Sequence, residues 1–153
     1  MSAYAYQTRT EPRLPDPATR PDFYAGVPTK RLIAWVFDVV LIAILAAIAV
    51  PFTAFLGIFF FPFLMLVLGF FYRWFTLSSG SATWGMRLMG LEMREADGQF
   101  LSNGTAFAHT LGYTISVSFP PLQLISIALI LFSPRKQSLT DHVLGTAALN
   151  RAL

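Results

Sequence analysis

The sequence contains no cysteine, so it forms neither a disulfide bond nor a thiolate metal site. Charged side chains are also scarce: they make up 12% of the chain, against roughly 25% in ordinary soluble domains. Hydrophobic residues supply 55% of its 153 positions, more apolar surface than a water-soluble core of this size can bury. The composition therefore predicts that lipid covers part of the chain.

The net charge of +3 is small and spread along the chain, so nucleic acid is not an expected partner. The Lys and Arg residues instead fit the cytoplasmic loops of a membrane protein, which carry an excess of these two residue types. Residues 1–29 lack the apolar stretch of a cleavable signal peptide. We therefore expect the first apolar segment to be an uncleaved signal anchor, with the amino terminus in the cytoplasm.

The apolar residues divide the chain into three parts. Residues 1–28 are polar and rich in proline, with few apolar side chains to bury, so we expect a disordered tail there. Residues 29–148 hold the long apolar segments and are predicted to form one transmembrane domain. Residues 149–153 are expected to be a short carboxyl-terminal tail.

Two long apolar runs predict two antiparallel transmembrane helices. Between Leu32 and Val50 only Asp38 is charged, and a helix of this run is roughly 28 Å long, close to the ~30 Å hydrocarbon core of a bilayer. Pro51 ends the run, and residues 52–72 form the second one. The connection between them is expected to be a tight turn on the non-cytoplasmic side.

A polar connection over residues 76–104 follows the second run. Tyr72, Arg73 and Trp74 precede it and are expected to anchor the second helix at the membrane interface. Residues 86–95 alternate loosely between apolar and polar side chains and lead into an Ala-Asp-Gly turn signal. We predict a short β-like excursion at the cytoplasmic surface.

The third apolar region, residues 105–132, is longer than the ~20 residues that one span needs, and Pro120 and Pro121 interrupt it. It forms either one kinked span or a hairpin that turns at the prolines. The hairpin is favoured slightly, because it keeps Arg135 and Lys136 on the cytoplasmic side. The fold class is therefore an all-α integral membrane protein with two spans and a proline-broken third region. A short amphipathic helix from about residue 138 completes it.

Asp38 is the first candidate for a functional residue, because a carboxylate inside an apolar span costs ~2.5–3.5 kcal/mol on insertion scales. One interpretation is a proton or cation site, since intramembrane carboxylates commonly mark ion paths. The other is a structural ion pair with a neighbouring cation. The sequence offers four such cations: Lys30, Arg31, Arg135 and Lys136.

Three sequence blocks share a pattern with one known family. The first block is KRLIAWVFD (residues 30–38), the second TWGMRLMGLEM (residues 83–93), and the third SPRKQSLTDHVLGT (residues 133–146). In order and spacing they resemble the RDD family of bacterial membrane proteins, named for one arginine and two aspartates. By position, the resemblance assigns these three to Arg31, Asp38 and Asp141.

The resemblance implies a location in the bacterial cytoplasmic (inner) membrane and a polar cluster of the three named residues. A transport role, including sodium–proton exchange, has been proposed for some family members. Two positions depart from the family pattern. Thr140 stands where the family often has His, and His109 stands where it often has Arg.

Two functions remain in competition. The leading hypothesis is cation- or proton-coupled transport of an ion or solute, and the alternative is a non-catalytic scaffold or assembly factor. We expect no enzymatic activity, because no nucleophile motif surrounds any serine. We also expect no cofactor and no metal site, since His109 and His142 are isolated histidines. The expected partners are the lipid bilayer and either further copies of the chain or another membrane protein.

Overall fold

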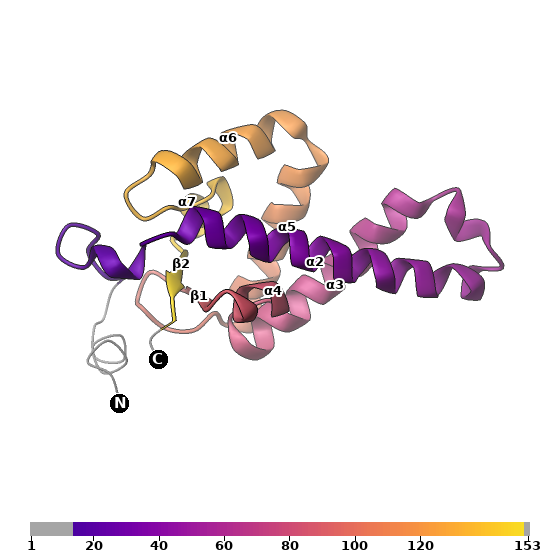
Figure 1. The fold of residues 1–153 in the computed structure, drawn as a ribbon, viewed down its shortest axis with the longest axis horizontal. Coiled ribbons are helices and arrows are strands. Elements are labelled where there is room, and N and C mark those ends of the chain that lie inside the picture. Colours follow the sequence, from indigo (N-terminus) through magenta and orange to yellow (C-terminus); the bar gives the residue numbers. More distant parts are fainter. Residues whose placement is uncertain (1–13, 152–153) are drawn as a thin grey trace.

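The structure is a computed structural model that describes residues 14–151. The chain is mostly helical (Figure 1). The helices and strands are α2 (Val27–Ala49), α3 (Phe61–Gly80), α4 (Trp84–Leu88), β1 (Leu91–Arg94), α5 (Asn103–Ser118), α6 (Pro120–Phe132), α7 (Leu139–Leu144) and β2 (Ala147–Asn150). Short 3-10 helices cover Pro21–Phe23, Val50–Thr53 and Leu56–Ile58. Among the described residues, α2 and α3 are each long and apolar enough to cross a membrane, and α5 with α6 is a third, broken candidate.

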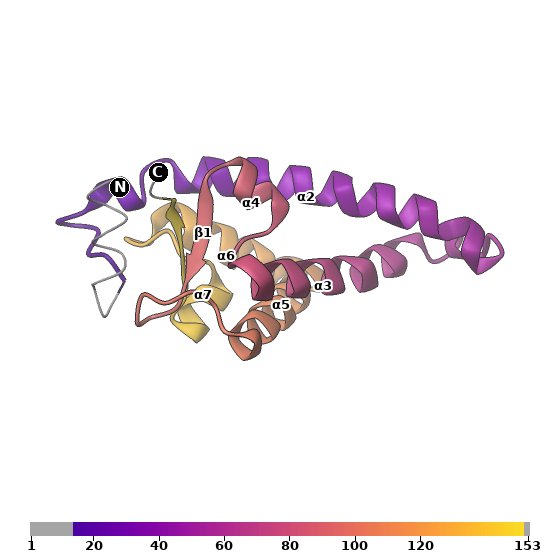
Figure 2. The same cartoon turned by 90° about the horizontal axis from the view of Figure 1, so that it is seen from below.

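Helices α2 and α3 run side by side in opposite directions, joined at the end of the molecule farthest from the sheet (Figures 1 and 2). Helix α2 begins after Gly26, which adopts φ +67°, and Pro28 occupies its first turn, where no N–H is needed. Ala34 and Asp38 are buried on one face of α2, and Leu32 lies on the exposed face. The prediction of two long antiparallel apolar helices is confirmed.

The start of the second helix differs from the prediction. We expected an apolar helix over residues 52–72 after a tight turn, but α3 begins at Phe61 and continues to Gly80. The connection is longer because Ala54 and Phe55 adopt positive φ values between two short 3-10 helices. Pro62 then fits the first turn of α3, where its missing N–H costs nothing.

The proline break in the third region is confirmed. The axes of α5 and α6 turn by 117° between Ser118 and Pro120, and the two helices pack against each other. Pro120 and Pro121 start α6 because proline lacks the N–H that a continuing helix would need. A bend this sharp fits the hairpin alternative better than one gently kinked span. Ser102 caps the start of α5 by accepting a hydrogen bond from the Thr105 N–H.

A two-stranded antiparallel sheet corrects the expectation of an all-α protein. The β-like excursion is strand β1, and its partner is β2 near the carboxyl end, with Leu91 opposite Asn150 and Arg94 opposite Ala147. Strand β2 is not predicted from the sequence, because the expected boundary between the transmembrane domain (residues 29–148) and the carboxyl-terminal tail (residues 149–153) falls inside it. A lone strand would leave its backbone groups unpaired, so the excursion needs this second strand.

The buried core gathers at the sheet end of the molecule. Leu77, Leu91 and Met93 are almost fully buried there. The opposite end and the outer faces of α2, α3 and α6 expose large apolar side chains, far more than a soluble monomer carries. These faces are suited to an apolar surrounding rather than to water.

The residues before α2 have local structure from Leu14 onward. Phe23 and Tyr24 are buried against Ala147 and Leu149 of β2, and the Tyr24 hydroxyl donates to the Pro15 carbonyl at 2.7 Å. This part of the expected tail therefore packs on the sheet. The expectation for residues 1–13 lies outside the described residues.

Candidate functional site

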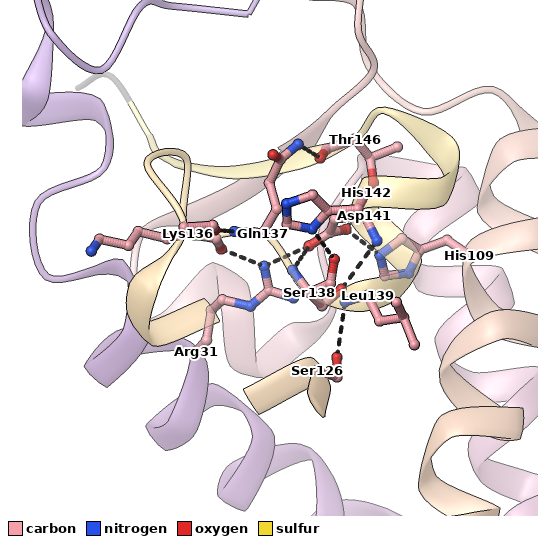
Figure 3. Close-up of polar contacts among 11 residues, drawn as sticks. Arg31, His109, Ser126, Lys136, Gln137, Ser138, Leu139, Asp141, His142 and Thr146 are labelled. Atoms are coloured by element: carbon pink, nitrogen blue, oxygen red, sulfur yellow. Dashed lines mark hydrogen bonds and ion pairs between the residues drawn. The ribbon is translucent and has the colours of Figure 1, made fainter. Parts of the chain in front are cut away.

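Asp141 is the centre of a buried polar cluster (Figure 3). Arg31 Nη1 lies 2.8 Å from Asp141 Oδ2, and the Ser138 N–H donates to the same oxygen at 3.0 Å. On the other side, the Thr146 hydroxyl donates to Oδ1 at 2.7 Å, and His109 Nε2 lies 2.7 Å from Oδ1. An ionised carboxylate only accepts hydrogen bonds, so His109 Nε2 is the donor of this contact. The cluster joins α2, α5 and α7.

The local sequence of α7 explains how Asp141 reaches this position. The Ser138 hydroxyl accepts a hydrogen bond from the Asp141 N–H, and the Asp141 carboxylate accepts one from the Ser138 N–H, which is a capping box. Gly145 ends the helix with φ +74°, a conformation that glycine adopts without strain. Thr146 is thereby turned back onto the carboxylate.

The charge of Asp141 is stabilised strongly. Complete burial alone would raise the pKa of its carboxyl, but the Arg31 guanidinium and the contacts from His109 and Ser138 outweigh burial. Together they hold the pKa of Asp141 well below its usual range. Asp141 is therefore ionised at neutral pH and forms a permanent ion pair with Arg31.

Asp38 lies in a different environment, held by three uncharged donors. The Tyr72 hydroxyl and the Gly85 N–H donate to its Oδ1 at 2.6 and 2.9 Å, and the Thr83 hydroxyl donates to its Oδ2 at 2.6 Å. Asp38 is only 5% exposed. Gly85 is required here because a side chain would collide with the backbone carbonyl of Ala34, so α4 approaches α2 closely.

The expected three-residue cluster is thus divided into two sites. Arg31 pairs with Asp141, while no Lys or Arg nitrogen of the part of the chain described lies within 4 Å of the Asp38 carboxylate. The cations proposed to support the cluster point elsewhere. Lys30 donates to the Asn150 side chain at 2.7 Å, and Lys136 donates to the Leu131 carbonyl at 3.2 Å.

The remaining supporting residue, Arg135, does not reach either carboxylate. Its Nε is buried and has no hydrogen-bond partner among residues 14–151. Lys136 contributes to the Asp141 cluster through its backbone, because its carbonyl lies 3.4 Å from Arg31 Nη1. The structural ion pair considered for Asp38 therefore does not form with any of the four cations named from the sequence.

Two cavities lie on either side of a shared group of side chains. The larger one, of about 400 Å³, lies between α2, α5 and α6, and the smaller one, of about 340 Å³, lies between α2, α3 and α5. Four residues line both cavities: Trp35, Asp38, Arg73 and Tyr113. The Trp35 indole N–H donates to the Tyr113 hydroxyl at 2.7 Å, so this contact is part of the wall that the two cavities share.

Arg73 belongs to the wall that the two cavities share and stacks on Tyr113. Its guanidinium carbon lies 4.0 Å from the centre of the Tyr113 ring, within the range of a cation–π contact. The sequence placed Arg73 and Tyr72 at the membrane interface, but both turn toward the interior, since Arg73 is buried and Tyr72 binds Asp38. His109, which the sequence presents as an isolated histidine, lies directly on Asp141 in the structure.

Among residues 14–151, no group of three or more His, Asp or Glu side chains is arranged to hold a metal ion. The candidate site consists of two separate carboxylates, Asp141 and Asp38. One is neutralised by Arg31, and the other is held by hydroxyl and backbone donors.

These features define a class: a small helical protein with apolar faces suited to a membrane, whose first helix is tied to its last by a buried Arg–Asp pair. Within that class the chain belongs to the RDD family, whose model matches residues 25–145. The RDD family is generally a membrane-associated domain. No curated protein and no solved structure matches the chain.

Proposed function

We propose that the protein is a multi-pass protein of the bacterial cytoplasmic membrane that moves a proton or a small cation past Asp38. Helices α2 and α3 cross the bilayer, and the sheet end of the molecule lies in the cytoplasm. The basic residues support this orientation, because Lys30 and Arg31 at the start of α2 lie beside Asn150 and Lys136 near the carboxyl end. The protein carries no enzymatic activity in this proposal.

The observation that carries the proposal is the position of Asp38. It lines both cavities together with Trp35 and Tyr113, and no Lys or Arg nitrogen among the described residues lies within 4 Å of its carboxylate. A carboxylate in a wall shared by two cavities can be reached from either cavity. For an ion bound to Asp38 to move on, the side chains of this wall need only open toward one cavity or the other.

The donors around Asp38 suit reversible binding of a cation. The hydroxyls of Tyr72 and Thr83 both donate and accept hydrogen bonds, so each turns its oxygen toward a cation when one arrives. A carboxylate and two hydroxyl oxygens are ligands of the kind that hard cations prefer. In the absence of the cation, the same hydroxyls stabilise the bare carboxylate.

Flux measurements in proteoliposomes test the proposal. The full-length protein is reconstituted with a pH-sensitive dye inside, and a sodium or potassium gradient is imposed. We expect dye-reported proton movement with the native protein and its loss in Asp38→Asn. Asp97→Asn is the matched control, because Asp97 lies in an exposed turn and its carboxylate accepts, among the described residues, only from the Gln99 N–H. Unchanged movement in Asp38→Asn would show that Asp38 is not the ion site.

A scaffold or assembly role is the second candidate, and the exposed apolar face of α2 favours it. Ile33, Val40 and Ile44 lie on this face, away from the rest of the molecule, and are each about half exposed. Either lipid or another helix covers the face. Affinity purification in a mild detergent decides: a stoichiometric membrane partner together with absent flux supports the scaffold, and self-association with flux supports transport.

A further inference from the structure

Arg73 is a buried cation without an anion. Its residue is 8% exposed, and within residues 14–151 its guanidinium donates no hydrogen bond and lies beyond 4 Å of every carboxylate. The stack on Tyr113 is its only polar contact in that part of the chain. Burial of a charge without a hydrogen-bonded partner is costly, so this position calls for an acceptor that residues 14–151 do not supply.

The carboxylate that lines the same two cavities does not fill this role. Asp38 lies beyond 4 Å of the Arg73 guanidinium, and its oxygens accept hydrogen bonds from Tyr72, Thr83 and Gly85 instead. Asp141 is occupied by Arg31. The donors of Arg73 therefore remain free toward the cavities.

The larger cavity combines a few polar groups with mostly apolar walls. Arg73, His109 and Gln123 lie among its lining residues, and His109 Nδ1 is a second buried polar atom without a partner in the described chain. The walls are formed by large apolar side chains of α2 and α6: Leu32, Trp35, Ile127, Ile130 and Leu131. A volume of about 400 Å³, mostly apolar with a few polar groups, is typical of a small-molecule site.

The cavity opens toward the surface that a membrane would cover. Leu32 is 61% exposed and Leu131 is 50% exposed, although both also line the cavity. A ligand therefore has access from between α2 and α6, from the lipid side. Such a route favours a molecule with a hydrocarbon chain over a small hydrophilic ion.

We propose that the larger cavity binds an anionic single-chain amphiphile, with its carboxylate or phosphate headgroup on Arg73 and its hydrocarbon chain between α2 and α6. The planar guanidinium offers paired donors that match either headgroup. This site does not depend on ion movement at Asp38, since binding is measured without any gradient.

Fluorescence quenching tests the binding. The full-length protein is placed in nanodiscs of neutral phosphatidylcholine, and a brominated long-chain fatty acid is added, because bromine quenches tryptophan on contact. Trp35 lines the cavity and is the reporter. Its share of the signal is the difference between the native protein and Trp35→Phe. We expect saturable quenching of Trp35.

Variants decide whether the headgroup lies on Arg73. Arg73→Gln keeps much of the side-chain volume but removes the charge, and we expect its affinity to fall by about tenfold or more, as for loss of a charge-assisted hydrogen bond. Arg87→Gln is the matched control, because Arg87 donates to the Ala82 carbonyl and does not line the cavity. Equal affinity in Arg73→Gln and the native protein would overturn the assignment.

A second variant keeps the test decisive if Arg73→Gln does not fold. Ile127→Phe enlarges a half-exposed side chain on the cavity wall, leaves Arg73 intact and adds no tryptophan, so the space for the hydrocarbon chain is narrowed while the charge remains. We expect saturable quenching of Trp35 to be lost. Saturable quenching of Trp35 that persists in Ile127→Phe overturns the proposal.

Competition distinguishes the two sources of the headgroup chemistry. An unlabelled fatty acid and a lysophosphatidic acid are each expected to displace the brominated acid, whereas acetate and inorganic phosphate at the same concentration are not. Displacement by acetate or phosphate alone would mean that the site binds free anions and would overturn the amphiphile assignment.

Discussion

Arg31 and Asp141 are 110 positions apart in the sequence, yet the guanidinium and the carboxylate lie 2.8 Å from each other. Their side chains are 11% and 0% exposed, so the pair is shielded from water. Arg31 belongs to the first turns of α2, and Asp141 is part of α7. This one contact therefore joins the beginning of the membrane-type domain to its end.

Breaking this pair is expected to destabilise the protein strongly. Asp141→Ala leaves the Arg31 charge and the donors of His109 and Thr146 without their acceptor, and such a loss costs about 3–5 kcal/mol. Thermal unfolding in detergent measures the change, with Asp97→Ala as the exposed control. Additive effects of Arg31→Ala and Asp141→Ala in the double variant would show that the two residues do not interact.

The stability of the protein is expected to fall in acid, and Asp141 is the main cause. Its folded-state pKa is lowered, so its contribution is complete above the unfolded value of about 3.9 and is lost as the pH falls toward the folded value. Unfolding curves between neutral pH and pH about 3 should show declining stability below pH about 5. The decline should be much smaller in Asp141→Asn.

Glu95 provides the control for this pH dependence. The Ser102 N–H donates to its carboxylate and lowers its pKa, but Glu95 is only partly buried, whereas Asp141 is fully buried. Glu95→Gln should therefore leave most of the acid sensitivity in place, because screening by solvent weakens the stabilisation of a charge that water reaches. If Glu95→Gln removes as much of the decline as Asp141→Asn, the assignment to Asp141 is wrong.

Close contact between α2 and α4 makes Gly85 sensitive to substitution. A Cβ there would press on the Ala34 carbonyl oxygen and lie 2.8 Å from Asp38 Oδ1. Because the Ala34 oxygen is backbone and cannot rotate away, Gly85→Ala should cost about 1–3 kcal/mol. Gly104→Ala is the matched control, since no atom of residues 14–151 lies within 4 Å of its added Cβ. Equal stability of the two variants in thermal unfolding would contradict the contact.

The sequence predicted helices better than the contacts between them. The apolar run after Lys30 defines α2, and the spacing of Arg31 and Asp38 correctly places them toward one face of it. Seven residues along a helix span about 10 Å, however. An arginine that binds Asp141 at the start of α2 therefore does not also reach Asp38. Only tertiary packing decides that Arg31 turns to Asp141 while Asp38 turns to Tyr72.

The sequence predicts too early a start for α3, and this explains why it also predicts Tyr72 and Arg73 at the membrane interface. An aromatic–basic pair after an apolar run of about 20 residues is the usual sign of a membrane boundary. Since α3 begins at Phe61, the same pair lies well inside the helix and faces its neighbours. The signal that predicts a later start is Pro62, which favours the first turn of a helix.

Both ends of the described chain are expected on the same side of the membrane. The Asn150 side chain donates to the backbone carbonyls of Asp22 and Ala25 at 2.8 Å, and it accepts from Lys30. Three full crossings would separate these residues by the thickness of the bilayer, whereas two spans and the bent α5–α6 pair keep them together. The contacts around Asn150 therefore predict an even number of crossings.

Reporter fusions measure this directly. Green fluorescent protein fused after Leu153 should fluoresce, because it folds in the cytoplasm, and alkaline phosphatase at the same position should be inactive. Alkaline phosphatase inserted in the connection between α2 and α3, next to Phe55, should be active. Active phosphatase after Leu153 would place Asp141 and Arg31 on opposite sides of the bilayer. Their 2.8 Å contact would then be impossible in the membrane.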